Sequence, residues 1–365
     1  MREKRSVFRG ALLGLAVGDA MGSAIDRKRL EDICNDYGPN GLMGYDLVNG
    51  YAEVSSYTQL AAYAANGLIM ALARSQAYGR SAPLIKYVSI ALREWSRTQQ
   101  YSPQEKNYCW LTTVPELKRR HCMDTRMLDA LTRETLGTPQ EPVFRNDLPS
   151  ALTEVIPAAL LGSIIEIEPD AVDLLGAEMV ALTHGDTETF LSAAALTHAL
   201  SVLVAEPDIG VKALIESVVD SVSLQFGREY GHTGHIWELL QMAQVLAESD
   251  SVTPMEAMEQ LRCRTAAEVL AGVLYACMTC HGDFDTAMIT AVNHSGRSAA
   301  VGAITGAVLG IHFGEEALPD FYLESLEPVH LLRQLADDLS QASVQNRMNR
   351  LFDDDWDRKY LHAGI

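Results

Sequence analysis

Apolar residues recur with the period of an α-helix along most of this 365-residue chain. Between Thr58 and Ala71 they fall three or four positions apart, which places them on one face of a helix. The same spacing returns in the segments 82–95, 152–167, 171–182, 189–204, 211–222, 236–247, 266–280, 298–313 and 329–339. Alternating runs of β-branched residues are nearly absent, so a Rossmann fold or TIM barrel is a poor fit. The sequence therefore predicts an all-α protein.

Glycines recur at every fourth residue in two stretches: Gly10, Gly14 and Gly18 near the N-terminus, and Gly302, Gly306 and Gly310 in the segment 298–313. Such faces let helix axes approach closely, and the charged residues Asp19 and Arg297 beside them favour a soluble core over a membrane dimer. No low-complexity linker divides the chain. We expect one compact domain over residues 1–345 and a polar surface tail over 346–365.

The charge balance narrows the range of partners. The chain has 29 Lys and Arg residues against 48 Asp and Glu residues, a net charge of −19. Such a surface repels phosphate backbones and anionic lipid heads, which argues against nucleic-acid and membrane partners. No uninterrupted apolar run approaches the roughly 20 residues that cross a bilayer, and the basic N-terminus lacks a convincing signal-peptide cleavage site. We expect a cytoplasmic protein.

Two short patterns resemble metal or cofactor sites. Cys277, Cys280 and His281 form a C-x-x-C-H sequence, which suits haem attachment or a zinc site. Because they end an apolar helical segment, buried structural cysteines are the favoured interpretation. His232 and His235 have H-x-x-H spacing, but no neighbouring residue completes a four-ligand set.

Four motifs follow one another along the chain: G-A-L-L-G-L-A-V-G-D-A-M-G at 10–22, S-S-Y-T-Q at 55–59, L-T-H-G-D at 182–186 and N-H-S-G-R-S-A-A-V-G at 293–302. In this order they resemble the ADP-ribosylglycohydrolase family, which carries T-D-D-T-Q, T-H-G-[DH] and N-x-G-G-D-[ST]-D-T-[VI]-G at the last three places. The resemblance runs from about Val7 to Pro319 and implies that family's single all-α domain.

The resemblance also implies a chemistry. Members of the family hold two magnesium ions with the oxygens of T-D-D-T and G-D-[ST]-D-T, and hydrolyse the N- or O-glycosidic bond to ADP-ribose. Magnesium prefers carboxylate and hydroxyl oxygens in a near-octahedral arrangement. Two dications held close together also need several negative charges around them.

This chain departs from the family at those positions. The T-D-D-T motif is replaced by Ser55, Ser56, Tyr57 and Thr58. In the later motif, the two aspartates and the following threonine become Arg297, Ala299 and Ala300, while Ser298 is kept. Four carboxylates are missing and a guanidinium has arrived, which opposes metal binding. The family's N-G-[AS]-x-M-R-x-x-P segment is also replaced, apart from Pro157. We therefore expect no metal cofactor and no magnesium-dependent activity.

Four residues near these motifs each allow a functional and a structural interpretation. Arg297 could bind a phosphate or carboxylate, or form a salt bridge with Asp19 or Glu53 that closes the cleft. Glu53 could act as a base, although an exposed loop glutamate is favoured. Asp19 could be catalytic, or could pack or cap a helix. Tyr57 could stack on a ligand ring, although filling the emptied site is favoured.

His184 and Asp186 allow the same two interpretations. They imitate an acid–base pair and belong to our candidate ligand-binding set, with Ser55, Ser56, Tyr57, Thr58, Arg297 and Ser298. Their spacing beside a helix start favours a core histidine with satisfied hydrogen bonds and a helix N-cap.

Three functions remain open. The first is a catalytically inactive or altered relative with a cleft for an ADP-ribose-like or other anionic small molecule. The second is a protein-interaction module whose cleft is closed. The third is an active ADP-ribosyl hydrolase with a metal-independent or otherwise non-standard site.

Overall fold

The computed structural model describes residues 3–100, 107–122, 124–231, 234–280, 282–343 and 354–361. The α-helices are α1 (Lys4–Ser23), α2 (Leu30–Tyr37), α3 (Ser56–Tyr78), α4 (Leu84–Gln99), α5 (Thr125–Thr132), α6 (Ile156–Leu161), α7 (Pro169–Ala181), α8 (Thr187–Ala205), α9 (Val211–Tyr230), α10 (Gly234–Ala247), α11 (Pro254–Leu261), α12 (Ala266–Thr279), α13 (Phe284–Val292), α14 (Ser298–Phe313), α15 (Asp320–Ser325), α16 (Val329–Ser340) and α17 (Asp354–Trp356). Short 3-10 helices are η1 (Trp110–Thr113), η2 (Pro149–Val155) and η3 (Glu315–Ala317), and a π-helical turn, η5 (Asp357–Leu361), follows α17. Extended pairing within the described residues is limited to two isolated β-bridges. The predicted all-α fold is confirmed.

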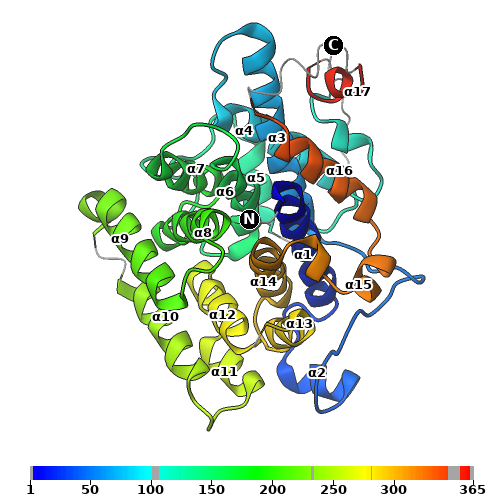
Figure 1. Cartoon of the computed structure of the whole chain (residues 1–365), viewed down its shortest axis with the longest axis vertical. Helices are drawn as coiled ribbons and strands as arrows, with labels where there is room; N and C mark the ends of the chain where they lie inside the picture. The colour runs from blue at the N-terminus through cyan, green and yellow to red at the C-terminus, as the bar shows by residue number, and fades with distance from the viewer. Residues whose placement is uncertain are drawn as a thin grey trace.

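An antiparallel pair of helices, α1 and α14, lies at the centre of the molecule (Figure 1). Their glycines meet in register, so that the two backbones touch. A Cβ atom added at Gly14 would lie 2.1 Å from the carbonyl oxygen of Gly306, and one at Gly18 would lie 1.8 Å from that of Gly302. The close packing expected from the two glycine faces is therefore an interaction between them.

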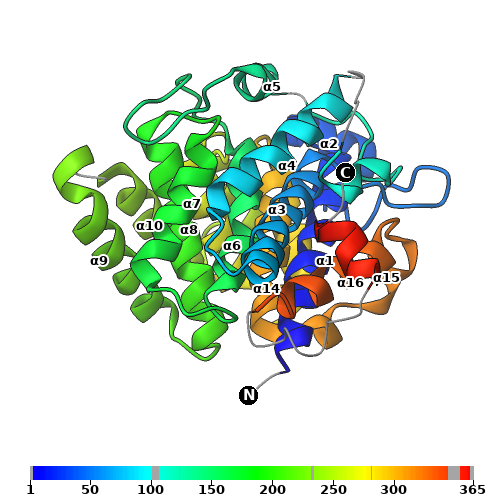
Figure 2. The ribbon, with the colours of Figure 1, turned by 90° about the horizontal axis from the view of Figure 1, so that it is seen from above.

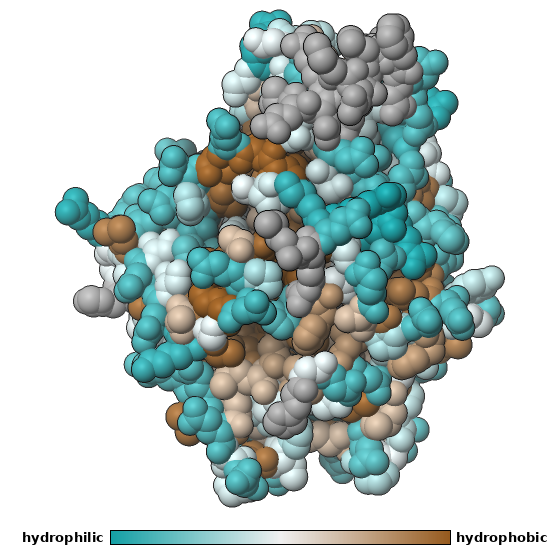
Figure 3. Space-filling view, in the orientation of Figure 1, coloured by the Kyte–Doolittle hydropathy of each residue, from teal (hydrophilic) through white to brown (hydrophobic). Residues whose placement is uncertain are grey.

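The other helices surround this pair. Helices α3, α8, α12, α13 and α16 pack directly on it, while α9 and α10 lie on one side of the molecule and α15 on the other (Figures 1 and 2). Hydrophilic side chains are spread over the face seen in Figure 3, and hydrophobic ones form separate patches.

The segment 152–167 differs from the continuous helix that its periodicity predicts. The chain forms η2 and then α6, which ends at Leu161. Pro157 explains the interruption, because it has no N–H to donate and its ring would clash with the carbonyl four residues earlier in an α-helix. The resulting turn brings Thr153 to the start of α3, where its Oγ1 donates to the Tyr57 carbonyl at 2.8 Å.

Two further features bear on location and on the tail. By length and composition, α8 is the one helix of the described chain that could span a membrane, but most of it is buried inside the fold. The part of the tail that the structure describes, 354–361, packs on the domain with Trp356 and Tyr360 buried. The cytoplasmic location and the boundary at residue 345 stay predictions.

Candidate functional site

The two motifs that differ from the family's metal-binding motifs, 55–59 and 293–302, meet where α1 ends and where α3 and α14 begin. Asp19, in the last turns of α1, faces the N-terminus of α3 and is fully buried. Its Oδ2 accepts from the Ser55 and Thr58 N–H groups at 2.8 and 3.0 Å and from Thr58 Oγ1 at 2.6 Å, while Ser55 Oγ donates to Oδ1 at 2.5 Å. Burial raises the pKa of Asp19, and these hydrogen bonds oppose that shift. Asp19 therefore holds the start of α3, which is the capping role.

Backbone strain shapes the loop that carries Arg297. Arg262 and Cys263 have φ angles of 62° and 51°, and Arg27 has a φ of 64°. Non-glycine residues rarely adopt this left-handed region, and holding them there costs free energy. Two of these left-handed residues form hydrogen bonds with the loop of Arg297. Arg297 N–H donates to the Cys263 carbonyl at 2.8 Å, and Arg27 N–H donates to the Gly296 carbonyl at 3.1 Å.

The Arg297 side chain lies near Asp26 and Tyr57. Burial raises the pKa of Asp26, and the Ala299 N–H and the charge of Arg297 oppose that shift. Burial and the charge of Asp26 raise the pKa of Tyr57, while Arg297 lowers it. Arg297 is half-buried and makes no side-chain hydrogen bond or ion pair with the residues that the structure describes.

The sequence allowed a salt bridge of Arg297 with Asp19 or Glu53. Among these described residues, neither pair forms one. Asp19 is occupied by Ser55 and Thr58. Glu53 Oε1 lies 3.1 Å from Arg119 Nη1, and the same arginine holds Glu327 through two hydrogen bonds. Glu53 is therefore bound in a surface ion-pair network.

The candidate ligand-binding residues divide by exposure. Ser55, Ser56 and Arg297 are partly exposed, whereas Tyr57, Thr58 and Ser298 are 8%, 1% and 0% exposed. Tyr57, Thr58 and Ser298 are therefore buried, and that Tyr57 fills the site stays a prediction.

His184 and Asp186 do not pair with each other. His184 is fully buried, with Nε2 2.8 Å from Ser150 Oγ and 3.2 Å from Asp124 Oδ2, and Nδ1 2.8 Å from Thr183 Oγ1. Burial raises the pKa of Asp124, but the hydrogen bond and charge of His184 outweigh it and hold that pKa below its usual range. Asp186 is the N-cap of α8 and accepts from Glu188 N–H at 3.1 Å. Both residues adopt the structural roles that their spacing favours.

The donor set at the α3–α14 site does not fit a pair of magnesium ions. Asp19 uses both oxygens on the N-terminus of α3. Asp26 accepts from the Ala299 N–H at 3.2 Å and pairs with Arg27 at 3.2 Å. Within the described ranges, no group of three or more His, Cys, Asp or Glu side chains could hold a metal ion.

The two other motifs lie away from this site. His235 Nδ1 lies 3.2 Å from Glu188 Oε2, and His232 is outside the described residues. Cys280 Sγ donates to the Cys277 carbonyl at 3.1 Å, and His281 is also outside the described residues.

Sequence reasoning missed Asp26. Asp26 lies beyond the end of α1 at Ser23, and no local pattern marks it, because its carboxylate accepts from Ala299, 273 residues away. Sequence reasoning also missed Ser150 and Asp124, the partners of His184, since neither is close to it in sequence.

Known proteins agree with this assignment of the fold. The chain is similar to a solved structure described as an ADP-ribosylglycohydrolase-related protein complex, with a TM-score of 0.57 and 21% sequence identity over 94% of this chain and 100% of that chain. No curated protein matches the chain. The family model for ADP-ribosylglycohydrolase matches residues 1–348. The chain belongs to the ADP-ribosylglycohydrolase family.

Proposed function

We propose that this chain is a family member that does not perform two-magnesium hydrolysis and instead binds an ADP-ribose-like or other anionic small molecule at the α3–α14 site. The observation that carries the proposal is Arg297, a half-buried cation without a hydrogen bond or ion pair among the described residues. A guanidinium offers a planar set of five donors that suits phosphate and carboxylate groups.

Helix geometry supports an anion beside Arg297. Arg297 is the N-cap of α14, and Ser55 is the N-cap of α3. The helix dipole favours negative charge at such termini. The neighbouring carboxylates are already engaged by donors, Asp19 by Ser55 and Thr58, and Asp26 by Ala299.

The decisive experiment is calorimetric titration of the full chain with ADP-ribose, with and without magnesium. We expect saturable binding that magnesium does not strengthen. Arg297→Ala should weaken it about tenfold or more, because a charge-assisted hydrogen bond contributes roughly 1.5–3 kcal/mol. Arg264→Ala, which removes an exposed arginine from the adjoining loop, is the matched control and should leave binding unchanged.

A hydrolysis assay completes the test. Incubation with an ADP-ribosylated protein should release no ADP-ribose above background, with or without magnesium. Magnesium-dependent release would overturn the proposal. Metal-independent release would support an active hydrolase with a non-standard site.

A second candidate function rests on Tyr57. Tyr57 is 8% exposed and lies near both Asp26 and Arg297, which favours a closed cleft and a protein-interaction role. In that case the wild-type chain should bind neither ADP-ribose nor other nucleotides. Tyr57→Ala would then open the site and allow Arg297-dependent binding.

A further inference from the structure

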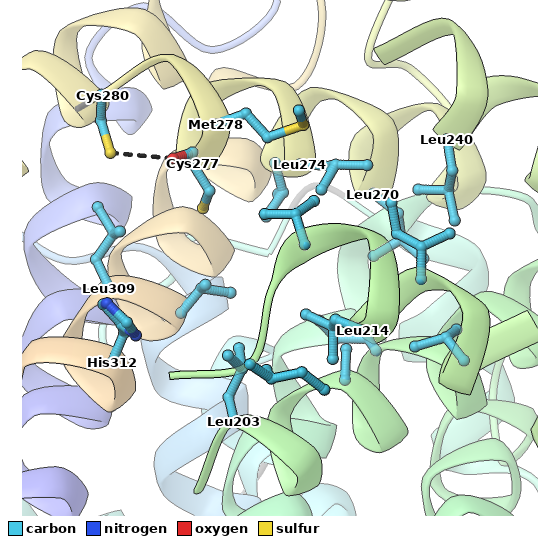
Figure 4. Close-up of a pocket in the computed structure, with 18 of the residues that line it drawn as sticks. Leu203, Leu214, Leu240, Leu270, Leu274, Cys277, Met278, Cys280, Leu309 and His312 are labelled. Carbon is cyan, nitrogen blue, oxygen red and sulfur yellow. Dashed lines mark hydrogen bonds between the residues drawn. The ribbon is translucent and has the colours of Figure 1, made fainter. Parts of the chain in front are cut away.

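A cavity lies at the other end of α14. Its walls come from α8, α9, α10, α12 and α14, and its volume is about 310 Å³ (Figure 4). Pockets that bind small molecules have volumes of about 300–1,000 Å³ and mostly apolar walls. Because α14 begins directly after Arg297 and reaches the cavity near Leu309, the two sites are separated by roughly 20 Å of helix. The cavity is therefore distinct from the α3–α14 site.

The shape of the cavity suits a chain. His312 and Cys280 lie at one end of the view, and Leu240 and Leu270 lie toward the other (Figure 4). Between them run two apolar walls, with Leu214 on α9 facing α12. An apolar cavity of about 150 Å³ binds benzene, so a cavity of about twice that volume accommodates roughly ten carbon atoms.

Its polar groups are confined to the His312 end. Among the described residues that line the cavity there is no carboxylate, lysine or arginine, and His312 is the only basic side chain. His312 lies in the last turn of α14, and an N–H of its imidazole ring can donate a hydrogen bond to an anion. The Cys277 thiol is neutral, because burial raises its pKa. One end of the cavity can therefore take a negative charge, and the rest only apolar groups.

We propose that this cavity binds an unbranched fatty acid of about ten carbons, with its carboxylate at His312 and its chain along α9 and α12. The apolar walls exclude polar metabolites, since a polar group buried there would lose its hydrogen bonds to water without replacement. A hydrogen bond from the His312 N–H to a carboxylate is charge-assisted, which distinguishes a carboxylic acid from an alcohol or an amine of the same length.

Calorimetric titration of the full chain with decanoate tests the occupancy. We expect saturable one-to-one binding. Ala199→Phe, which places a ring in the cavity from α8, should weaken it at least tenfold. Val211→Trp, at the exposed rim on α9, is a second blocking variant for the case that Ala199→Phe does not fold. Leu224→Phe is the control on the same helix, because Leu224 is 81% exposed and lies outside the cavity.

The charged end has its own test. His312→Gln should weaken decanoate binding about tenfold and leave decan-1-ol binding unchanged, since only the acid forms a charge-assisted hydrogen bond there. No binding of decanoate to the wild-type chain would overturn the proposal, as would equal affinities in the blocking variants and the control. An equal loss of decanoate and decan-1-ol in His312→Gln would overturn the placement of the carboxylate.

Discussion

Glu154 is a carboxyl group buried without partners at the centre of the fold. It lies in η2, is 0% exposed, and neither of its oxygens accepts a hydrogen bond within the described chain. Burial raises its pKa well above the usual value. The group is therefore held protonated, because an isolated buried charge is much costlier than a neutral acid.

Glu154 makes the free energy of unfolding fall as the pH rises. The folded pKa is raised, so the stability contribution of Glu154 is fully present below its unfolded pKa of about 4.3 and is lost as pH rises toward the folded value. Glu154→Gln removes this loss. Relative to wild type, the variant should gain about 1.4 kcal/mol of unfolding free energy per pH unit above roughly pH 5.

Urea unfolding between pH 5 and pH 8 measures the gain. The control is Glu206→Gln, at an exposed position after α8, which should follow the wild type across the range. A Glu154→Gln curve parallel to that of the wild type would show that Glu154 is ionised and paired in solution.

The sequence predicted the site in part, for physical reasons that differ by residue. The resemblance of the motifs to those of the family located the loops of Ser55 and Arg297. It could not show that Asp19 caps α3, since that contact joins positions 36 residues apart. The left-handed Arg262 and Cys263 carry no signal either, because glycine is the residue that usually marks such backbone.

At the level of elements, the α1–α14 contact is fixed by glycine, and periodicity alone could not pair the two helices. Gly14→Ala should destabilise the fold by about 3 kcal/mol or more, because the added carbon would lie 2.1 Å from the rigid Gly306 carbonyl. Gly227→Ala, in the interior of α9, meets nothing within 4 Å and should stabilise it by about 0.5–1 kcal/mol through helix propensity.

Chemical denaturation of the two alanine variants compares them directly. We expect the free energy of unfolding to fall in Gly14→Ala and to rise in Gly227→Ala, although both variants replace glycine with alanine. A small effect of Gly14→Ala would mean that α1 and α14 can move apart, and that the backbone contact does not determine their spacing.

On the scale of the whole molecule, the end of the chain joins helices that are distant in sequence. Tyr360 is 0% exposed, and its hydroxyl donates to Asp338 Oδ2 on α16 at 2.7 Å. Arg74, on α3, donates to the Leu361 carbonyl at 3.2 Å. Composition predicted a polar tail over 346–365, and it could not reveal this contact because two buried aromatic residues carry it among many charges.

If the tail belongs to the cooperative unit, Tyr360→Ala should destabilise the entire fold by about 3–5 kcal/mol, as truncation of a buried aromatic side chain does. Tyr360→Phe removes only the hydrogen bond to Asp338 and should cost about 1 kcal/mol. Differential scanning calorimetry should show a single transition shifted to lower temperature in both variants, further for alanine. An unchanged main transition in Tyr360→Ala would separate the tail from the domain, and α3 and α16 would then be stable without it.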